Sequence, residues 1–398
     1  MSDPDRDFSG PKQTISRRVD DIAAELFELS RVLYEHPETA YEEHEACRWL
    51  SDWIGHKGFS VETGVGGIET AFLAKPPGFT GKRPIVAFMA EYDALPGIGH
   101  GCGHNLIAAS SLGAAAALAG GSLLLDGDFL LIGTPAEEGG GGKARLADGG
   151  VFDDVDMALL CHPGRYNRVG DPSLGRIKVH VQFFGKTAHA STAPHLGRNA
   201  LDALVLAYVN ISALRQQLPP DVRLHGIITK GGEAPNIIPD RAEGLYYVRS
   251  ASKAYLYDIL IQRFEDCLNG AAKATGCTCK MTILPPSLEP MLRNPTLERV
   301  WADNAKSLGV VIDEGESSPG SSDVGNISHR MPTIQPRLAI CDPSVNIHST
   351  DFADATQSET GKAALILSAK TLAMTAYDYL TRPEVRKAAT EEFASAAR

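Results

Sequence analysis

The sequence predicts an α/β fold, a mostly parallel sheet with helices on both faces, interrupted by a smaller inserted α+β domain. Strand-like apolar runs alternate with helical patterns toward both ends of the chain, which is typical of a parallel sheet. The middle of the chain instead follows the strand, helix, strand, strand, helix, strand order of a ferredoxin-like domain. The length of 398 residues is about two to three times that of one typical domain. We therefore predict one domain from residues 1–174 and 287–398, with residues 175–286 inserted as the second.

The first domain shows both kinds of pattern. Apolar residues recur at helical spacing from residue 16 to 53, and a break at His36-Pro37-Glu38 predicts two helices joined by a corner. The run Pro84–Ala90 is short and continuously apolar, as expected of a strand buried on both faces. Further elements are predicted at 106–120 (helix), 129–133 (strand), 157–160 (strand), 297–308 (helix) and 360–380 (helix).

The inserted domain shows a different pattern of apolar and polar residues. From residue 177 to 184 apolar and polar residues alternate, which predicts a half-exposed strand. The amphipathic stretch 199–218 predicts a helix that packs on the sheet. The remaining elements are predicted at 222–229 (strand), 242–248 (strand), 253–274 (helix) and 279–284 (strand).

The composition excludes several classes of protein. Lys and Arg number 38 against 49 Asp and Glu, and the net charge of −11 argues against a nucleic-acid partner. Seven cysteines without dense spacing and a polar N-terminus favour the reducing cytoplasm. Residues 106–125 carry no charge and are long enough to span a bilayer, yet their richness in Ala, Ser and Gly predicts a buried helix and no membrane partner.

Polar residues with metal-binding chemistry follow the predicted strands of the first domain. Loops beyond the carboxyl ends of parallel strands converge on one crevice, so residues distant in sequence can meet there. Cys, His and carboxylate side chains hold divalent transition metals, and the Cys-x-His spacing lets both residues point inward from one tight loop. The candidates are Asp93, Cys102, His104, Glu137, Glu138, His162 and His348.

The adjacent pair Glu137-Glu138 is costly to bury unless a cation neutralises it. One of the two can bind the metal, and the other can take a proton from water as a general base. Taken singly, these residues have ordinary interpretations: Cys102 as a small buried apolar residue, His162 as a hydrogen-bonded core histidine, and the glutamates as a solvated loop. Their joint placement at the strand ends favours a metal centre.

These motifs resemble those of metallopeptidase family twenty, which holds aminoacylases, carboxypeptidases, dipeptidases and the auxin-conjugate and aminobenzoyl-glutamate hydrolases. The resemblance spans nearly the whole chain, with the motifs in order. The matching pieces are His36-Pro-Glu38, Ala90-Glu-Tyr-Asp-Ala-Leu-Pro96, His100-Gly-Cys-Gly-His-Asn105, Pro135-Ala-Glu-Glu-Gly139, Gly185-Lys-Thr-Ala-His189, Pro235-Asn-Ile-Ile-Pro239, Gly320-Ser-Ser-Asp-Val-Gly325 and His348.

The resemblance implies a catalytic domain with a bound metal pair, often zinc, manganese or cobalt. It also implies an inserted lid domain that forms a homodimer or a higher homo-oligomer. Five residues fall on the metal-ligand positions of the Cys-containing branch: Cys102, His104, Glu138, His162 and His348. Many members carry His-x-Asp where this chain has Glu91-Tyr-Asp93, so Asp93 is expected to orient a ligand, and whether one ion or two are bound stays open.

The resemblance also implies catalytic and substrate contacts. Glu137 falls on the general base, and His189 matches a histidine that in relatives reaches across the dimer to polarise the scissile carbonyl. Asn236 matches an oxyanion or substrate contact. Arg249 matches a position that grips a substrate carboxylate, a task to which a guanidinium fork is suited.

The reaction implied is hydrolysis of a C–N bond by metal-activated water. The small-molecule substrate is expected to be an N-acyl amino acid, a dipeptide or an aromatic amide that bears a carboxylate. The stretches 94–100 and 320–329 most resemble the subgroup with aminobenzoyl-glutamate hydrolases and small dipeptidases. Two alternatives stay open: an aminohydrolase that releases ammonia from an aromatic amino acid by attack on the ring, and a catalytically dead relative that acts as a binding protein.

Overall fold

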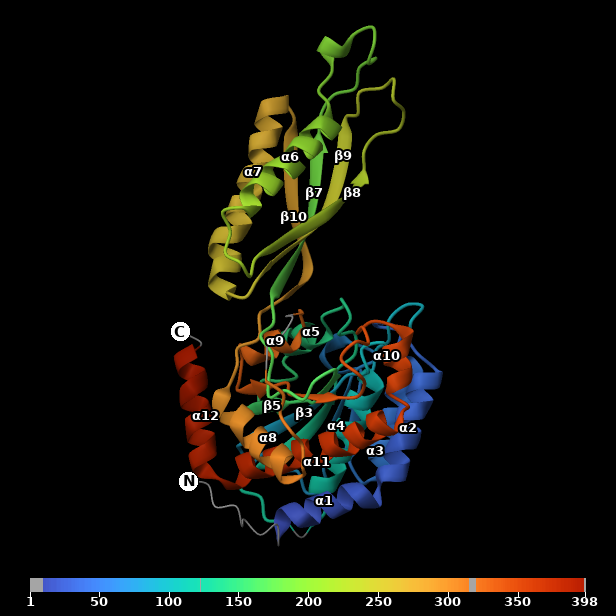
Figure 1. Cartoon of the computed structure of the whole chain (residues 1–398), viewed down its shortest axis with the longest axis vertical. Helices are drawn as coiled ribbons and strands as arrows, with labels where there is room; N and C mark the ends of the chain where they lie inside the picture. Colours follow the sequence, from blue (N-terminus) through green and yellow to red (C-terminus); the bar gives the residue numbers. More distant parts are fainter. Residues whose placement is uncertain (1–9, 122, 315–319, 397–398) are drawn as a thin grey trace. The chain divides into compact units, whose positions relative to one another are not determined.

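The computed structural model describes residues 10–121, 123–314 and 320–396 (Figure 1). Residues 1–9, which contributed to the cytoplasmic prediction, lie outside the described residues. The chain divides into two compact units. Unit 1 comprises Met1–Asp171, Leu292–Ser318 and Asn326–Arg398, and unit 2 comprises Pro172–Met291 and Pro319–Gly325.

Unit 1 is built on a six-stranded sheet with the strand order β1-β2-β4-β3-β5-β11. Strands β4, β3, β5 and β11 run parallel, which confirms the predicted mostly parallel sheet, while β1 and β2 form an antiparallel edge. Strands β1 and β2, of four residues each, were not predicted from the sequence. The strands are β1 (Ser60–Thr63), β2 (Phe72–Lys75), β3 (Ile85–Ala90), β4 (Asp128–Gly133), β5 (Met157–Leu159) and β11 (Thr333–Ile334), and a separate pair joins β6 (His162–Gly164) to β12 (Arg337–Ala339).

Helix α4 contacts α1, α2, α3 and α11. All residues of α4 except Ala116 are buried, because the helix packs against β3, α2 and α11. This burial explains its uncharged sequence, and within the described ranges no helix is both long and apolar enough to cross a membrane. The helices, of which α9 begins in unit 2, are α1 (Pro11–Asp21), α2 (Ala23–Glu35), α3 (His44–His56), α4 (His104–Leu118), α5 (Gly142–Asp148), α8 (Pro295–Ser307), α9 (Val324–Ser328), α10 (Thr350–Ala355), α11 (Glu359–Thr381) and α12 (Pro383–Ala396).

The N-terminal helical segment is broken twice, where the sequence predicted one break. The additional break is at Ile22, whose φ of −107° and ψ of 6° separate α1 from α2. The predicted break at His36-Pro37-Glu38 lies between α2 and α3. The carboxylate of Glu38 caps the N-terminus of α3. It accepts hydrogen bonds from the free backbone N–H groups of Glu45 and Ala46, at 3.2 and 2.8 Å.

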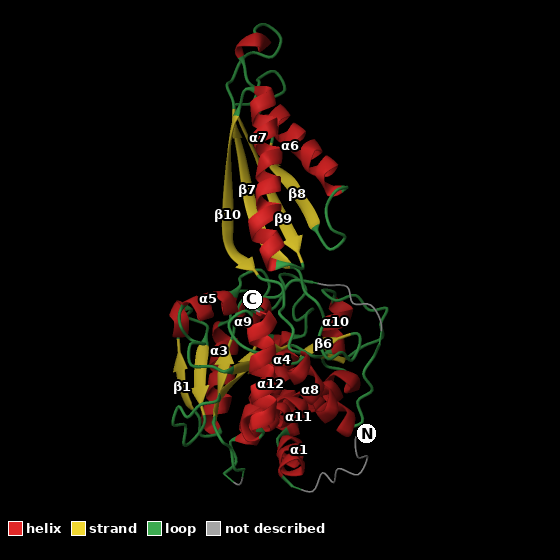
Figure 2. Cartoon of the chain, turned by 90° about the vertical axis from the view of Figure 1, so that its left-hand side faces the viewer, coloured by secondary structure: helices red, strands yellow, loops and turns green. Residues whose placement is uncertain are grey.

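Unit 2 has the predicted ferredoxin-like order, an antiparallel sheet β10-β7-β9-β8 covered on one face by α6 and α7 (Figure 2). Alternate side chains of β7 and β9, such as Phe183 and Val248, are buried in the core of this unit, and those between them are mostly less buried. The elements are β7 (Gly175–Phe184), α6 (Ala200–Arg215), β8 (Arg223–Lys230), β9 (Arg241–Ser250), a π-helical stretch (Tyr255–Leu260), α7 (Ile261–Thr275) and β10 (Thr278–Leu288).

Strand β10 is longer than predicted. It continues through Pro285 and Pro286 to Leu288, with a register shift after Leu284. Prolines are tolerated there because β10 is an edge strand, so the missing N–H groups interrupt no ladder between two partners.

The segment 320–325 groups with unit 2, whereas the sequence patterns predicted it as part of the first domain. Two hydrogen bonds account for this: the backbone N–H of Leu174 donates to the carbonyl of Gly320 at 2.7 Å, and Arg249 donates to the hydroxyl of Ser321 at 2.9 Å. The segment therefore belongs to the surroundings of Arg249.

Gly133, the last residue of β4, leaves space for the ring of Phe72 on β2. A Cβ atom at this position would lie 2.2 Å from the ring, which is fully buried and stacked on Tyr92. We expect Gly133→Ala to lower the free energy of unfolding by about 2 kcal/mol, measured by urea denaturation. The control Gly121→Ala, whose Cβ would have nothing within 4 Å, should have little effect. Equal losses in both variants would contradict the packing argument.

Candidate metal centre

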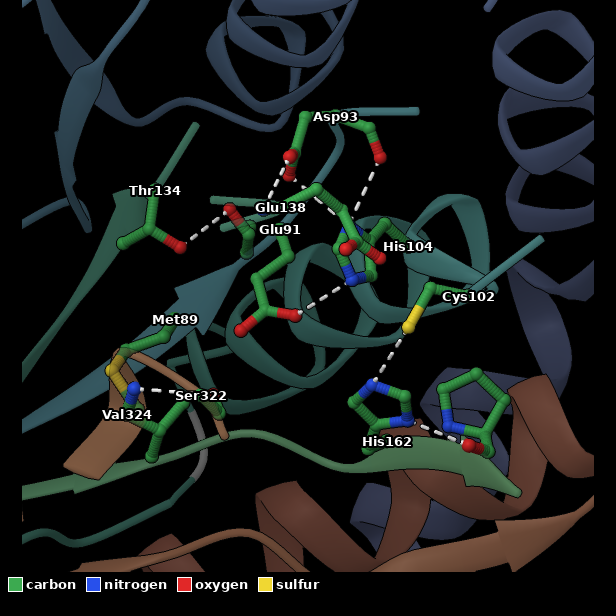
Figure 3. Close-up of polar contacts among 12 residues, drawn as sticks. Met89, Glu91, Asp93, Cys102, His104, Thr134, Glu138, His162, Ser322 and Val324 are labelled. Carbon is green, nitrogen blue, oxygen red and sulfur yellow. Dashed lines mark hydrogen bonds and ion pairs between the residues drawn. The ribbon is translucent and has the colours of Figure 1, made fainter. Parts of the chain in front are cut away.

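The candidate residues of unit 1 lie beyond the ends of three neighbouring strands (Figure 3). Asp93 follows β3, the pair Glu137-Glu138 follows β4, and His162 follows β5. Strands β4, β3 and β5 are adjacent and run in the same direction, so their carboxyl ends present these side chains at one edge of the sheet.

The possible ligand atoms form three overlapping groups, in each of which all atoms lie within 4.8 Å of one another. The groups are Cys102 with His104 and His162, Cys102 with Glu138 and His348, and His104 with Glu137 and Glu138. Because Cys102, His104 and Glu138 each belong to two groups, the six side chains form one continuous cluster. The structure thus brings together the five residues predicted as metal ligands and the residue predicted as the base.

Uncommon backbone conformations help to aim these side chains. The glycine between the two residues of the Cys-x-His motif, Gly103, has φ +79°, and a Cβ there would lie 2.4 Å from Pro163. His348 has φ 66°, a conformation that costs a non-glycine residue about 1 kcal/mol or more. Its N–H donates to the carbonyl of Gly101 at 2.9 Å, which ties it to the loop that carries the motif.

Asp93 orients two of the candidate ligands (Figure 3). One carboxylate oxygen accepts a hydrogen bond from Nδ1 of His104 at 3.0 Å, and the other accepts the backbone N–H of Glu138 at 2.8 Å. With Nδ1 engaged, the Nε2 atom of His104 is the one available to a metal. This geometry fits the orienting role predicted for Asp93.

His162 presents its Nε2 atom to the cluster in the same way. Nδ1 donates to the carbonyl of Pro163 at 2.6 Å, and Nε2 lies 3.5 Å from the sulfur of Cys102. Burial, together with the charge of Arg337, holds the pKa of His162 well below its usual value. The imidazole is therefore neutral at physiological pH, which is the form that binds metals.

The remaining groups make the cluster strongly attractive to cations. Although burial alone would lower it, Asp93 and Cys102 raise the pKa of His104 well above its usual value. Hydrogen bonding to Cys102 and Glu138 raises the pKa of His348 to about 10. Both imidazoles are therefore protonated more readily than a free histidine, because the groups around them at this edge of the sheet are negatively charged.

The donor set fits a divalent transition metal. Nε2 of His104 and Oε1 of Glu138 are buried and make no close, well-aligned hydrogen bond with the described residues; their charged neighbours, Glu91 and His348, each lie 3.4 Å away. Buried polar atoms of this kind are costly unless another group completes them. A divalent cation would replace the protons that the cluster otherwise attracts, and thiolate, imidazole and carboxylate are its usual donors.

A buried ion pair beside the ligands escaped prediction. Nζ of Lys143 lies 2.7 Å from one carboxylate oxygen of Glu91, and both side chains are fully buried. The other oxygen of Glu91 lies 3.4 Å from Nε2 of His104 (Figure 3). Glu91 therefore faces a candidate ligand atom, and Lys143 compensates part of its charge. The departure from His-x-Asp marked Glu91 in the sequence, but nothing marked Lys143.

The loop before α3 supports Glu137 through its neighbour Ala136, and this too escaped prediction. The fully buried carboxylate of Glu43 accepts the N–H of Ala136 at 2.9 Å. Ala136 has φ 60°, so the backbone that presents the glutamate pair is held in a rarely populated conformation. The hydroxyl of Tyr41 donates to the carbonyl of Gly140 at 2.6 Å and anchors the other end of the same loop.

The other three predicted site residues, His189, Asn236 and Arg249, belong to unit 2. His189 and Asn236 are neighbours, because the backbone after β7 pairs with the backbone before β9 at this point. Arg249 lies near the opposite end of β9, eight residues beyond the first residue of that strand, Arg241. At the usual rise of a strand this separation is about 26 Å.

The exposed ring of His189 has a defined tautomer. Its Nδ1 atom accepts hydrogen bonds from the backbone N–H groups of Ser191 and Thr192, each at 3.3 Å. The proton of the neutral ring is therefore on Nε2, which can donate to an oxygen outside this loop.

Hydrolases that activate water at the edge of a parallel sheet share this combination of fold and donor cluster, and the protein falls in their class. The chain belongs to peptidase family M20/M25/M40, whose model matches residues 87–366. This membership confirms the resemblance found in the motifs.

Three relatives illustrate the membership. The chain is 39% identical over 397 residues to an Xaa-Arg dipeptidase of Mus musculus, covering 96% of this chain and 92% of the relative. It is 33% identical over 328 residues to one of the subunits of the p-aminobenzoyl-glutamate hydrolase of Escherichia coli, covering 75% and 66%. A dinuclear metal-binding peptidase of the M20 family from Bacillus subtilis shares the fold, with a TM-score of 0.69 at 21% identity, covering 90% of this chain and 99% of that one.

Glu43 provides a test of the buried charge near the cluster. Burial, and then the charge of Asp93, raise the pKa of Glu43 to about 7. A carboxyl group whose pKa is raised by folding stabilises the folded state fully below its unfolded pKa, and this contribution is lost as the pH rises through 7. In metal-free protein, Glu43→Gln should therefore gain stability relative to wild type as the pH rises, by up to about 3 kcal/mol.

The measurement is urea denaturation of both proteins from about pH 4 to about pH 8, where the titration of this carboxyl should fall. The amide suits the site because the Thr70 hydroxyl, which donates to Glu43 at 3.0 Å, can also accept. Glu42→Gln, a change at the exposed neighbour, serves as the control and should follow wild type. A pH-independent difference for Glu43→Gln would contradict the assigned titration.

Proposed function

We propose that the protein is a metal-dependent amidohydrolase that cleaves a small N-acyl amino acid or dipeptide with a free carboxylate. The observation that carries this proposal is that Glu137 lies among the candidate ligands of the cluster. The mouse and Escherichia coli relatives support it, because one is a dipeptidase and the other an aminobenzoyl-glutamate hydrolase. Their names differ in the amine product, arginine or glutamate, so the choice of substrate side chain must come from residues of this chain.

We propose that two divalent ions, of zinc, manganese or cobalt, are held by Cys102, His104, Glu138, His162 and His348. The three donor groups supply more atoms than the four of a tetrahedral site, and the Bacillus subtilis relative is described as dinuclear. Cys102, His104 and Glu138 each belong to two of the groups, so these residues would connect the parts of the cluster that hold the ions. Bound ions would supply Lewis-acid chemistry, polarising the scissile carbonyl and lowering the pKa of water.

The residues of the chain carry the proton transfers and hold the substrate. Glu137, whose exposed fraction is 9%, takes a proton from the attacking water and delivers it to the leaving nitrogen. Asp93 keeps His104 oriented while this happens. Nε2–H of His189 and the amide of Asn236 donate to the carbonyl oxygen as it gains charge, and the fork of Arg249 receives the substrate carboxylate.

We propose that each substrate site combines residues of two subunits. His189 lies beyond the end of β9 at which Arg241 stands, and Arg249 lies about 26 Å along the strand from that end, which is farther than a dipeptide can span. If both residues contact one substrate, they come from different copies of the chain. This supports the homodimer predicted from the resemblance.

The edge strand β8 and the helix α6 offer the apolar surface for such a dimer. Ile227 and Ile228 on β8 are 62% and 42% exposed, and Val205 and Val209, one turn apart on α6, are 46% and 56% exposed. An unpaired edge strand with apolar side chains is a template for strand addition. A two-fold axis would pair β8 with its copy and bring the two α6 helices together.

We propose the cytoplasm as the compartment. All seven cysteines are free thiols. Disulfides are rare in reducing compartments, so this thiol content supports the assignment.

The role of Glu137 is tested by Glu137→Ala. We expect this variant to fold and to retain divalent metal, because five candidate ligands remain, yet to lose activity about a thousandfold through the missing base. Metal content is measured by inductively coupled plasma mass spectrometry, and products are identified by mass. A new carboxylate plus an amine indicates amide hydrolysis, whereas a hydroxylated ring plus ammonia indicates the aminohydrolase alternative.

The matched control for the metal is Glu138→Ala, which should lose metal as well as activity. Dialysis against a chelator should abolish wild-type turnover, and added metal should restore it. Wild-type turnover in Glu137→Ala, or turnover unaffected by the chelator, would overturn the proposed mechanism.

The two-subunit site is tested by mixing inactive variants. Glu137→Ala and His189→Ala homodimers should each be inactive. A hybrid dimer has one site with both residues intact, so equal mixing with subunit exchange should restore about a quarter of wild-type activity. Activity that stays absent although exchange is verified by mass, or a monomeric active enzyme, would rule out a shared site.

A further inference from the structure

Two arginines of unit 2 lie opposite each other on adjacent strands. Arg176 on β7 and Arg249 on β9 are direct register partners, and their sequence neighbours Ile177 and Val248 point to the other face, into the core formed with α6 and α7. Like charges directly opposite each other in a sheet repel and destabilise it. Two arginines at these positions therefore require a negatively charged group that compensates their repulsion.

Both guanidinium groups lie close to the ring of Tyr247. The Cζ atom of Arg176 is 5.0 Å from the ring centroid, and that of Arg249 is 5.4 Å from it. A cation near an aromatic face gains about 1 kcal/mol, which is less than a bound anion supplies. The shared ring holds the two positive groups near each other without neutralising either.

No acidic side chain compensates these charges in the described part of the chain. Among the described residues, only the hydroxyl of Ser321 accepts a hydrogen bond from either arginine, from Nη1 of Arg249 at 2.9 Å. The Nε atoms of both arginines are buried and have no partner among the described residues. Arg337, which is also partly buried, differs: its Nε atom lies 2.9 Å from a carboxylate oxygen of Asp171.

Burial makes the missing partner costly. Arg176 is only 8% exposed, so its charge is largely removed from water. Burial and the charge of Arg176 together lower the pKa of Arg249. A single monocarboxylate carries one negative charge and would neutralise only half of the charge of the two guanidinium groups.

We propose that Arg176 and Arg249 together form a dianion site that binds the two carboxylates of a dicarboxylate substrate, one on each guanidinium. This inference rests on the proposed function, which assigns the terminal carboxylate to Arg249, and it names the substrate class: amides of acidic amino acids. Each planar fork can hold one carboxylate bidentately, with Ser321 fixing the orientation of Arg249. Arg176 is then the residue that selects the acidic side chain.

Direct binding tests this site without requiring turnover. Calorimetric titrations of the metal-loaded full chain use glutarate, butyrate and inorganic phosphate as probes. We expect wild type to bind glutarate at least about tenfold more tightly than butyrate, since a charge-assisted bond to a second carboxylate is gained. Arg176→Met, which keeps an apolar stem, should lose that preference and bind butyrate as wild type does. Arg249→Met should weaken the binding of both glutarate and butyrate.

Arg223→Met is the matched control. Arg223 is the next arginine in the same cross-strand row, paired with Arg249 in register, but it is exposed and Nη1 donates to the carbonyls of Pro220 and Val222. This variant should bind all three probes as wild type does. Arg176→Lys keeps the charge and guards against misfolding of the Met variant; it should retain part of the glutarate preference.

Kinetics separate this inference from the function on which it rests. With N-acetyl-glutamate and N-acetyl-glutamine, wild type should favour the acidic substrate in kcat/KM at least about tenfold, and Arg176→Met should not. If glutarate binds as expected but neither substrate is turned over, the proposed function is wrong and the dicarboxylate site stands. Equal binding of glutarate and butyrate by wild type, a preference that survives in Arg176→Met, or phosphate bound more tightly than glutarate would overturn the dicarboxylate site.

Discussion

The concentration of negative charge at one edge of a buried sheet is the constraint on which unit 1 depends. Three parallel strands end there, and the residues beyond them include Glu91, Asp93, Glu137 and Glu138. Carboxylates this close repel one another, and burial adds to the cost. The fold compensates by pairing Glu91 with Lys143 and by placing imidazoles between the acids. The negative charge that remains uncompensated makes the cluster suited to binding divalent cations.

The second constraint is orientation. The donors lie on loops or at the first residue of an element, as His104 does in α4 and His162 in β6, and contacts from other parts of the chain fix them. Asp93 holds His104 and the backbone of Glu138, while Glu43 holds Ala136. These contacts maintain backbone conformations that would otherwise relax, so the donors are already arranged before a metal or substrate arrives.

Unit 2 distributes its polar residues differently. The hydrogen-bond donors His189 and Asn236 lie beyond one end of its sheet. The arginines Arg176 and Arg249 lie near the other end. The helices cover one face, so charged residues can gather only on the opposite face or beyond the strand ends. In the proposed mechanism, the groups that stabilise the reacting carbonyl are thus separated from those that recognise the substrate charge.

The sequence by itself determined the mostly parallel sheet, the inserted ferredoxin-like unit and the donors of the cluster. Periodicity reveals strands and helices, and parallel strand ends must converge, so residues such as Cys102 and His162 could be selected from their positions alone. Short or irregular features escaped this logic: β1 and β2 are too brief for a periodic signal, and the break at Ile22 follows no helix-stop residue. Only the tertiary structure decided the surroundings of Glu43, Lys143 and Arg176. Whether a charged side chain is buried, and what pairs with it, depends on segments far away in the sequence, and that information is carried by packing rather than by any local pattern.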